Sequence, residues 1–460
     1  MGYDLIVIGG GAAGMSAARS ARRRRARVAL VQAGPVGGDC TFVGCVPSKT
    51  LIEAAGTGVD FDEAMGRVGR VVKGIAATET ADVLRGEGIE VFEGAGRLLG
   101  PHRVGVGGGE LQARQVIIAT GTVPMIPPVP GLADLDVLTN ENVFDLTTRP
   151  ASLIVIGGGP IGVELAQAFA RFGTAVTVVE VAGRLLASEE PEASEVVTDA
   201  LATDGVRVVT GRRVVTARSG PSGCVVQLDD GSDIGGARVL VALGRRPCTD
   251  ELDLGAAGVA VDQSGFVRTD DHLRTNVRGI WAAGDIAGKL QFTHAADDMG
   301  RIAADNALSK VAYRRFRADH TPAVTFTDPE VARVGMTEAT AATAFPGARV
   351  AYLPMSQVDR AIAAERTDGF VKLVVGPRRL TGDVAGGRLL GATVVAPRAG
   401  EMIHEAALVM RARMFPALLA MTSHAYPTWS MAIRQAATQQ FFEIDGRQAR
   451  PARPTPEPSP

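Results

Sequence analysis

The feature of this sequence that most constrains its fold is an internal repeat. Residues 3–18 read YDLIVIGGGAAGMSAA, and residues 152–166 read SLIVIGGGPIGVELA. Each copy is a short β-rich apolar run, then G-x-G-x-x-G, then an alanine-rich stretch, which predicts a strand, a sharp turn and a helix. Glycines in this pattern let the chain turn sharply, let backbone N–H groups approach a pyrophosphate, and let the helix pack on the strand. Two copies, each behind a strand and before a helix, therefore predict two dinucleotide-binding folds.

A polar residue at the end of the second strand of each copy should hold the ribose of the bound nucleotide. In the second copy the strand AVTVVE ends at Glu180, whose carboxylate suits a free 2′-hydroxyl and so indicates NAD rather than NADP. Arg184 lies close by and would weaken that preference, so NADPH stays open. In the first copy RVALVQ ends at Gln32, which can hydrogen-bond hydroxyls without the strength of a charged partner.

The size and charge of the chain exclude several classes of protein. Its 460 residues exceed what one hydrophobic core organises and suggest about three domains. The net charge of −2 gives no general attraction to nucleic acid or to an anionic membrane. No apolar run approaches the roughly 20 residues of a membrane span, and the N-terminus has no basic segment before its apolar run. We therefore expect a soluble, cytoplasmic protein.

Two of the four cysteines, Cys40 and Cys45, lie five residues apart in GGDCTFVGCVPSK, residues 37–49. A zinc site would need two more ligands, and no further cysteine or histidine lies within fifty residues. Two incidental buried thiols would leave the neighbouring glycines, proline and lysine unexplained. A redox-active pair fits better, because Pro47 and Ser48 suit the first turn of a helix whose N-terminus stabilises a thiolate. The residues alone thus favour redox chemistry over the other two interpretations.

Together with the two glycine motifs, three stretches carry a resemblance to a known family: GGDCTFVGCVPSK, ATG at 119–121 and AAGD at 282–285. Over about residues 3–446 the chain resembles the pyridine nucleotide–disulfide oxidoreductases, which include dihydrolipoamide dehydrogenase, glutathione reductase and mercuric reductase. The resemblance implies an α/β protein with two Rossmann-like doubly wound nucleotide-binding domains and a C-terminal α+β dimerisation domain. The expected parts are an FAD-binding domain in 1–148 and 271–320, an NAD(P)-binding domain in 149–270, an interface domain in 321–446, and a disordered proline-rich tail in 447–460.

The resemblance also implies the cofactors and the route of the electrons. FAD would occupy the first fold, and NADH or NADPH the second. Hydride would pass from the nicotinamide to the flavin, and electrons would then reduce a Cys40–Cys45 disulfide. Cys45 would lie nearer the flavin and Cys40 would attack the substrate, while Lys49 would pair with Glu164 beside the flavin. The implied FAD-binding residues are Gly9, Gly11, Gly14, Gln32, Gly38, Thr120, Gly121, Gly284 and Asp285. The implied nicotinamide-binding residues are Gly157, Gly159, Gly162, Glu180 and Gly244.

The segment HAYPTWSM, residues 424–431, departs from the pattern of the disulfide-reducing relatives. In those relatives a histidine before the proline, oriented by an acid five positions on, transfers protons across a dimer interface. Here Tyr426 and Met431 stand at those two positions. Because a phenol with a pKa of about 10 is a poor base at pH 7, we do not expect efficient turnover of lipoamide or glutathione disulfide. His424, two residues upstream, is the other candidate for proton transfer.

With tyrosine at this position the segment resembles that of mercuric reductase. However, no cysteine follows Cys248 to form that enzyme's C-terminal cysteine pair. We therefore expect the acceptor to be a small disulfide, a metal–thiol complex or a specialised metabolite. Three alternatives stay open: a quinone or dye reductase in which electrons leave directly from FAD, a mercuric reductase without the C-terminal pair, and a non-enzymatic FAD-binding subunit. The protein should be a homodimer whose active site is completed by the partner subunit. We expect no protein-bound metal ion and no nucleic-acid or membrane partner.

Overall fold

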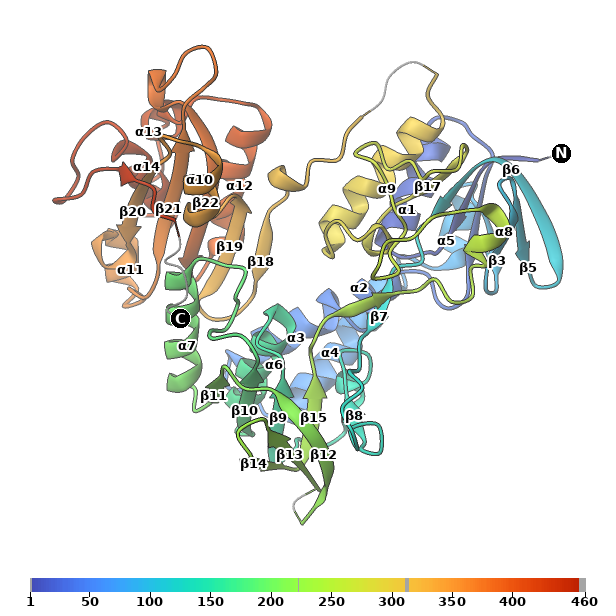
Figure 1. Cartoon of the computed structure of the whole chain (residues 1–460), viewed down its shortest axis with the longest axis horizontal. Helices are drawn as coiled ribbons and strands as arrows, with labels where there is room; N and C mark the ends of the chain where they lie inside the picture. Colours follow the sequence, from blue (N-terminus) through green and yellow to red (C-terminus); the bar gives the residue numbers. More distant parts are fainter. Residues whose placement is uncertain (1, 222, 311–313, 455–460) are drawn as a thin grey trace. The chain divides into compact units, whose positions relative to one another are not determined.

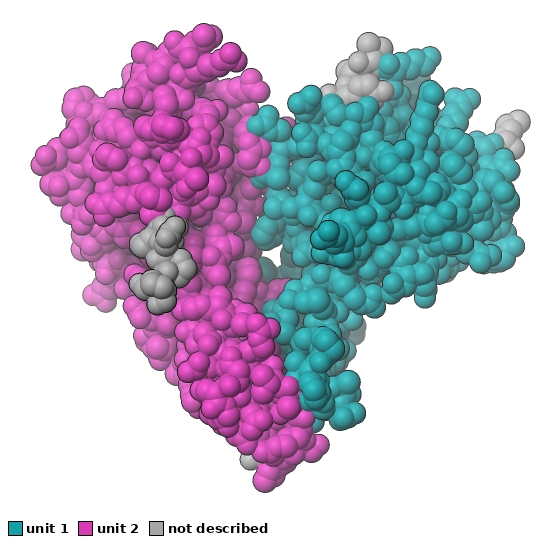
Figure 2. Space-filling model, viewed as in Figure 1, with its two compact units in different colours: residues 1–150, 238–318 teal, residues 151–237, 319–460 magenta. Residues whose placement is uncertain are grey.

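A computed structural model describes residues 2–221, 223–310 and 314–454 (Figure 1). The chain falls into two compact units, shown in teal and magenta in Figure 2. Unit 1 comprises residues 1–150 and 238–318, and unit 2 comprises residues 151–237 and 319–460. Each unit therefore combines two stretches that are far apart in the sequence.

Unit 1 is built on a seven-stranded sheet in the order β3-β2-β1-β6-β5-β4, with β17 beside β6. The first copy of the repeat forms its centre, because β1 (Tyr3–Ile8) pairs in parallel with β2 (Val28–Gln32) and with β6 (Gly109–Ile118). One face of β1 packs with α1 (Ala12–Arg23) and α9 (Thr293–Ala307), and the opposite face is buried in a second apolar cluster. Burial on both faces explains why β1 is a continuous apolar run rather than an alternating one.

The remaining elements of unit 1 are β3 (Glu90–Glu93), β4 (Arg97–Gly100), β5 (Arg103–Val106), β7 (Thr122–Pro124), β8 (Val137–Leu138), β15 (Arg238–Val241), β16 (Arg245–Pro247), β17 (Ile280–Ala282), α2 (Gly38–Phe42), α3 (Cys45–Ala55), α4 (Phe61–Ala76), α5 (Ala81–Gly86) and α8 (Leu254–Ala257).

The second copy of the repeat has the same form in unit 2. Here β9 (Ser152–Ile156), α6 (Pro160–Arg171) and β10 (Ala175–Glu180) follow one another, and β9 pairs in parallel with β10. β11 (Arg207–Thr210) extends this sheet on the other side of β10. The part is completed by α7 (Pro191–Thr203) and an antiparallel sheet of β12 (Val214–Gly220), β13 (Gly223–Leu228) and β14 (Asp233–Gly236).

The C-terminal part of unit 2 is a six-stranded antiparallel sheet in the order β18-β19-β22-β21-β20-β23. α12 (Ala399–Arg411) and α14 (Met431–Thr438) pack on its central strands, β21 (Phe370–Gly376) and β22 (Arg388–Ala396). The two strand–helix–strand folds and this sheet confirm the predicted fold class. The other elements are β18 (Ala323–Thr325), β19 (Glu330–Gly335), β20 (Arg349–Pro354), β23 (Arg450–Pro451), α10 (Glu338–Ala344), α11 (Asp359–Ala363) and α13 (Ala417–Met421).

The proline-rich tail differs from the expected disorder in its first part. β23 pairs with β20, and the Arg450 guanidinium donates to both carboxylate oxygens of Glu338. This charge-assisted contact holds the chain on the edge of the sheet although the segment is rich in proline. Residues 455–460 of the expected tail lie outside the described residues.

A buried lysine joins the two parts of unit 2. The side chain of Lys372, in β21, is 1% exposed, and its Nζ lies 3.2, 2.7 and 3.1 Å from carboxylate oxygens of Glu190, Glu192 and Glu338. Burial disfavours the ammonium, but the three carboxylates outweigh it and raise the pKa of Lys372. We call these four residues the Lys372 cluster. It ties the start of α7 to the antiparallel sheet.

No helix in the described part of the chain is both long enough and apolar enough to cross a lipid bilayer.

Candidate active site

The first glycine motif forms a tight turn between β1 and α1. Gly9 has φ = +107°, a conformation that side chains rarely permit. A Cβ on Gly14 would lie 1.8 Å from the carbonyl oxygen of Gly9, so only glycine lets the helix pack this closely on the turn. Gly11 precedes α1, and because it has no side chain it cannot accept a hydrogen bond from the first N–H groups of that helix. A Cβ at Gly11 would meet only the Cα of Gly38, at 3.8 Å. The open space and unsatisfied N–H groups fit a dinucleotide pyrophosphate.

The second motif has the same geometry in unit 2. Gly159 precedes α6 without a side-chain cap, and no heavy atom lies within 4 Å of the position that its Cβ would occupy. The N-terminus of α6 is therefore also open to a phosphate group.

Gln32 and Glu180 hold the two glycine turns at equivalent places. The Oε1 of Gln32 accepts a hydrogen bond from the N–H of Gly10 at 2.5 Å. The two carboxylate oxygens of Glu180 accept from the N–H groups of Gly158 and Ala182 at 2.6 and 2.7 Å. Both residues predicted to hold a ribose therefore lie beside their glycine turns.

Because of Arg184, NADPH stayed open as an alternative to NADH, but the side chain of Arg184 points toward residues 186–194 of its own chain segment. Its guanidinium donates to the carbonyl oxygens of Leu186, Ala187 and Glu189 and to the hydroxyl of Ser194, at 2.6 to 3.3 Å. Four acceptors therefore occupy this side chain beside the second glycine turn.

Cys40 and Cys45 lie in contact, Cys40 in α2 and Cys45 as the first residue of α3. Neither is in a disulfide, and Cys45 is the more exposed. A hydrogen bond to Cys45, together with burial, raises the pKa of the Cys40 thiol. The Sγ of Cys45 lies 3.2 Å from Oγ1 of Thr293, the first residue of α9. Because the N-termini of α3 and α9 meet at Cys45, this position favours a thiolate.

No motif in the sequence pointed to Thr293 as a partner of the cysteines. It lies 248 residues from Cys45 and reaches it only because α9 packs beside α1 in the fold. The order in which the two cysteines act stays a prediction.

The turns after β6 and β17 meet the first glycine motif. A Cβ on Gly9 would lie 2.3 Å from the carbonyl oxygen of Ala119, and a Cβ on Gly284 would lie 2.9 Å from the Cβ of Ala13 in α1. Thr120 and Gly121 directly follow Ala119, and Asp285 follows Gly284. The structure thus brings the predicted flavin-binding residues of three separate segments together in unit 1.

Asp285 is a largely buried carboxylate at this meeting point. Burial raises the pKa of its carboxyl group, against the nearby charge of Arg245. Its Oδ2 accepts a hydrogen bond from the hydroxyl of Thr122 at 3.2 Å. An acceptor held in this way suits the hydroxyl groups of a bound ribityl chain.

Sequence reasoning missed Arg245, which joins these turns to the cysteine segment. Its Nε donates to Oγ1 of Thr122 at 2.7 Å, and its Nη1 donates to Oδ1 of Asn140 at 3.2 Å. It also forms an ion pair with Asp39, the residue before Cys40. The turn LGRRP was recognisable, but these partners lie 123, 105 and 206 residues away in the sequence.

Three predicted site residues lie in a different unit from their expected partners. Lys49 is in unit 1 and Glu164 in unit 2, where Glu164 is buried and accepts from the N–H of Phe326 at 2.8 Å. Gly244 is in unit 1, whereas the other residues predicted for the nicotinamide are in unit 2. Their pairing with those partners stays a prediction.

The segment at 424–431 holds a histidine–carboxylate pair that the motif did not reveal. The Nε2 of His424 lies 2.9 Å from Oε2 of Glu405 in α12, and its Nδ1 lies 2.9 Å from the carbonyl oxygen of Thr422. Tyr426 is 70% exposed, and a hydrogen bond to Asp359 raises the pKa of its phenol. Tyr426 is thus a proton donor rather than a base near neutral pH, whereas His424 has an acid that orients it.

Among the described residues, no group of three or more His, Cys, Asp or Glu side chains is arranged to hold a metal ion. The groups that suit a ligand are instead the two open helix N-termini and the polar side chains around them.

Comparison with known proteins assigns the family. Residues 3–300 match the family described as "Pyridine nucleotide-disulphide oxidoreductase", and residues 321–437 match its dimerisation domain. The chain belongs to this family. The predicted resemblance is therefore confirmed, and membership implies an oxidoreductase that uses FAD and a pyridine nucleotide.

Relatives of this oxidoreductase have several activities. It is 33% identical to a mercuric reductase of Staphylococcus aureus over 89% of this chain and 77% of the relative. It is 35% identical to a dihydrolipoyl dehydrogenase of Thermus scotoductus over 95% of this chain and 96% of the relative. A copper(II) complex of the HOCl-induced flavoprotein disulfide reductase RclA from Escherichia coli is 30% identical, covers 95% of this chain and 99% of that chain, and has a TM-score of 0.87.

Proposed function

We propose that this oxidoreductase uses NADH to reduce the Cys40–Cys45 pair, which then reduces a small disulfide, a metal–thiol complex or a specialised metabolite bearing such a bond. One observation carries the proposal: the two thiols lie in contact at the N-terminus of α3, beside Thr293. The helix that bears Cys40 begins at Gly38, and a Cβ on Gly38 would lie 2.8 Å from the Cα of Gly11. The thiol pair therefore adjoins the dinucleotide turn within one unit. FAD, when bound, supplies the two-electron chemistry that links the nicotinamide to these sulfurs.

The sulfur chemistry follows from the pair itself. Cys40 attacks one sulfur of the substrate disulfide as its thiolate, forming a mixed disulfide, and the proton that the Cys40 thiol gives up goes to the first substrate thiolate that is released. The Cys45 thiolate then attacks the Cys40 sulfur, forming the Cys40–Cys45 disulfide and releasing the second thiolate, which is also protonated. Two electrons thus pass from the cysteines to the substrate. Thr293 hydrogen-bonds Cys45 and holds it at the helix end.

Proton delivery to the leaving thiolates is the role that we assign to His424. Glu405 orients its imidazole, as the acid of a histidine dyad does. Tyr426 stays protonated and can only donate a hydrogen bond. The segment would reach the thiol pair of the second copy in a homodimer. In support, eight of the fourteen large apolar side chains that are exposed in the described part of the chain lie in residues 321–446.

Replacing His424 with glutamine tests this role. We expect disulfide reduction to fall about 100-fold, because the leaving thiolates lose the group that protonates them. Glu405→Gln should reduce the rate about tenfold, because the imidazole loses the carboxylate that orients it. His404→Gln, on the exposed side of α12, is the matched control. A rate of disulfide reduction in His424→Gln equal to that of the wild type would remove His424 from the mechanism.

NADH rather than NADPH is the electron donor that the second glycine turn supports. Glu180 places a negative charge where a 2′-phosphate would lie, and the donors of Arg184 are occupied. We expect Glu180→Ala to lower kcat/KM for NADH about tenfold while that for NADPH stays the same or rises. The exposed Glu195 in α7, changed to alanine, is the control. Steady-state kinetics with both nucleotides measures this, and a parallel loss for both would contradict the assignment.

The acceptor is tested on the FAD-loaded protein with NADH under anaerobic conditions. The panel consists of a small aliphatic disulfide, copper(II) and mercury(II) each with excess thiol, and a benzoquinone. The mercuric reductase relatives and the copper(II) complex of RclA support the metal–thiol members of the panel. Turnover of a disulfide or metal–thiol complex supports the proposal. Turnover of the quinone alone would replace it with the quinone reductase alternative.

A further inference from the structure

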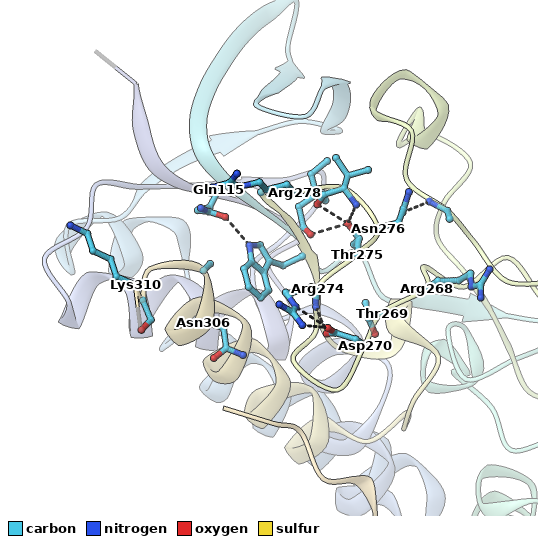
Figure 3. Close-up of a pocket in the computed structure, with 17 residues that line it drawn as sticks. Gln115, Arg268, Thr269, Asp270, Arg274, Thr275, Asn276, Arg278, Asn306 and Lys310 are labelled. Atoms are coloured by element: carbon cyan, nitrogen blue, oxygen red, sulfur yellow. Dashed lines mark hydrogen bonds and ion pairs between the residues drawn. The ribbon is translucent and has the colours of Figure 1, made fainter. Parts of the chain in front are cut away.

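A second concave site lies in unit 1, away from the glycine turns (Figure 3). Its volume is about 1130 Å³, and its walls include Gln115 of β6, Ile280 and Trp281 at the start of β17, and Asn306 at the end of α9. The glycine turns and Asp285 follow the carboxyl ends of β1, β6 and β17. β17 pairs in parallel with β6, and Ile280 pairs with Val116 at the amino end of this pairing. The pocket therefore lies at the opposite end of these strands from the dinucleotide site.

The charge of this pocket is opposite to that of the whole chain. Four cations line it, Arg268, Arg274, Arg278 and Lys310, with one carboxylate, Asp270. Arg274 is paired with Asp270 at 2.7 Å. The other three cations form no ion pair with any described residue. The lining thus carries a charge of 4 − 1 = +3, while the chain as a whole carries −2.

The neutral polar groups of the wall leave few acceptors for a cationic or neutral ligand. The side-chain amides of Asn276 and Asn306 are bonded to backbone groups, and Trp281 Nε1 donates to Oε1 of Gln115 at 2.8 Å. The hydroxyl oxygen of Thr269 is buried and has no hydrogen-bond partner among the described residues. The groups that remain for a ligand are therefore mainly donors, and most of them carry a positive charge.

We propose that this pocket binds an elongated small molecule with a chain of phosphate groups. Guanidinium groups donate pairs of parallel hydrogen bonds to phosphate oxygens, and lysine adds a point charge. Lys310 and Arg268 stand at opposite ends of the view in Figure 3, with Arg278 and the Arg274–Asp270 pair between them. Charges spread in this way suit several phosphates in a row better than a single anion. The volume admits a ligand of nucleotide size.

The pocket is connected to the thiol pair by one rigid element. Asn306 lies near the end of α9, and Thr293, which contacts Cys45, is its first residue. A helix of 15 residues spans about 22 Å, so a ligand in this pocket is remote from the redox chemistry. The proposal therefore stands apart from the proposed function, and either can fail alone.

Isothermal titration of the FAD-loaded protein with inorganic tripolyphosphate tests the site, with ATP as the second probe. Both titrations are run with saturating NAD⁺, so that the second glycine turn is occupied. We expect one saturable site whose affinity falls as salt is raised. Arg268→Gln with Arg278→Gln should weaken binding at least tenfold, since it removes two charge-assisted contacts to the phosphate oxygens. The matched control is Arg67→Gln with Arg70→Gln, which removes two exposed charges from α4 of the same unit.

Comparing the affinities for the two probes shows which part of the ligand the pocket recognises. Equal affinity for tripolyphosphate and ATP assigns recognition to the phosphate chain, and tighter binding of ATP shows that the wall around Trp281 also binds the nucleoside. Absence of saturable binding of both probes would overturn the proposal. Equal binding by the pocket variant and the wild type would also overturn it. NADH-driven acceptor reduction should be the same in the pocket variant and the wild type.

Discussion

Replacing Cys45 with alanine is expected to abolish NADH-driven reduction of disulfides and metal–thiol complexes. The rate should fall on the order of 10³-fold or more, because the variant cannot close the Cys40–Cys45 disulfide that releases the second substrate thiol. The substrate should instead remain attached to Cys40 as a mixed disulfide, which mass spectrometry of the intact chain detects. NADH oxidation by a benzoquinone should continue, since that reaction does not use the sulfurs.

Cys224→Ala is the matched control for this variant. Cys224 is buried in β13 of unit 2, where its Sγ donates to the carbonyl oxygen of Gly236 at 3.1 Å. Its loss should leave disulfide reduction within about twofold of the wild type, because a buried thiol of this kind contributes to packing and not to the redox chemistry. If Cys45→Ala reduced disulfides as fast as the wild type, electrons would leave this protein without passing through the cysteine pair.

Replacing Lys372 with methionine is expected to destabilise unit 2 more than any surface change. Methionine fills a similar volume, but it leaves Glu190, Glu192 and Glu338 facing one another without their shared cation. Removing one partner of a buried ion pair costs about 3–5 kcal/mol, because the remaining charges stay buried. For a unit of this size the apparent melting temperature should fall by roughly 10 °C. Differential scanning calorimetry of the FAD-loaded protein measures the change.

Two further variants separate the charge effect from packing. Lys73→Met removes an exposed lysine from α4 and should change the melting temperature by no more than about 1 °C. Glu190→Gln added to Lys372→Met should recover part of the loss, because it removes one of the uncompensated carboxylates. A melting temperature of Lys372→Met equal to that of the wild type would show that the cluster contributes nothing to stability.

Much of the fold was readable from the sequence because the repeat is local. Each strand, glycine turn and helix occupies a continuous stretch, and the glycines have conformations or close contacts that other residues do not permit. The same local reading gave Gln32 and Glu180, which lie beside the turns as expected. The pairing of Cys40 with Cys45 was expected from the residues around them and from the family resemblance, and the two thiols lie in contact.

What the sequence did not show depends on contacts between distant residues. Arg245 reaches Asp39 over 206 positions, and Lys372 reaches Glu190 over 182. Glu405 pairs with His424 from α12, outside the motif in which an acid was sought. The edge pairing of Arg450–Pro451 overrides a composition that favours disorder. In each case the partner is chosen by tertiary packing, which no spacing rule encodes.

Thiol labelling measures whether electrons from NADH reach the Cys40–Cys45 pair. The FAD-loaded protein is oxidised, incubated anaerobically with or without NADH, alkylated with iodoacetamide, and digested for mass spectrometry. We expect NADH to add two labels per chain, both on the peptide that contains Cys40 and Cys45, while labelling of Cys224 and Cys248 stays the same. If NADH reduced the flavin and added no label to that peptide, the cysteines would not receive the electrons and the proposed function would be wrong.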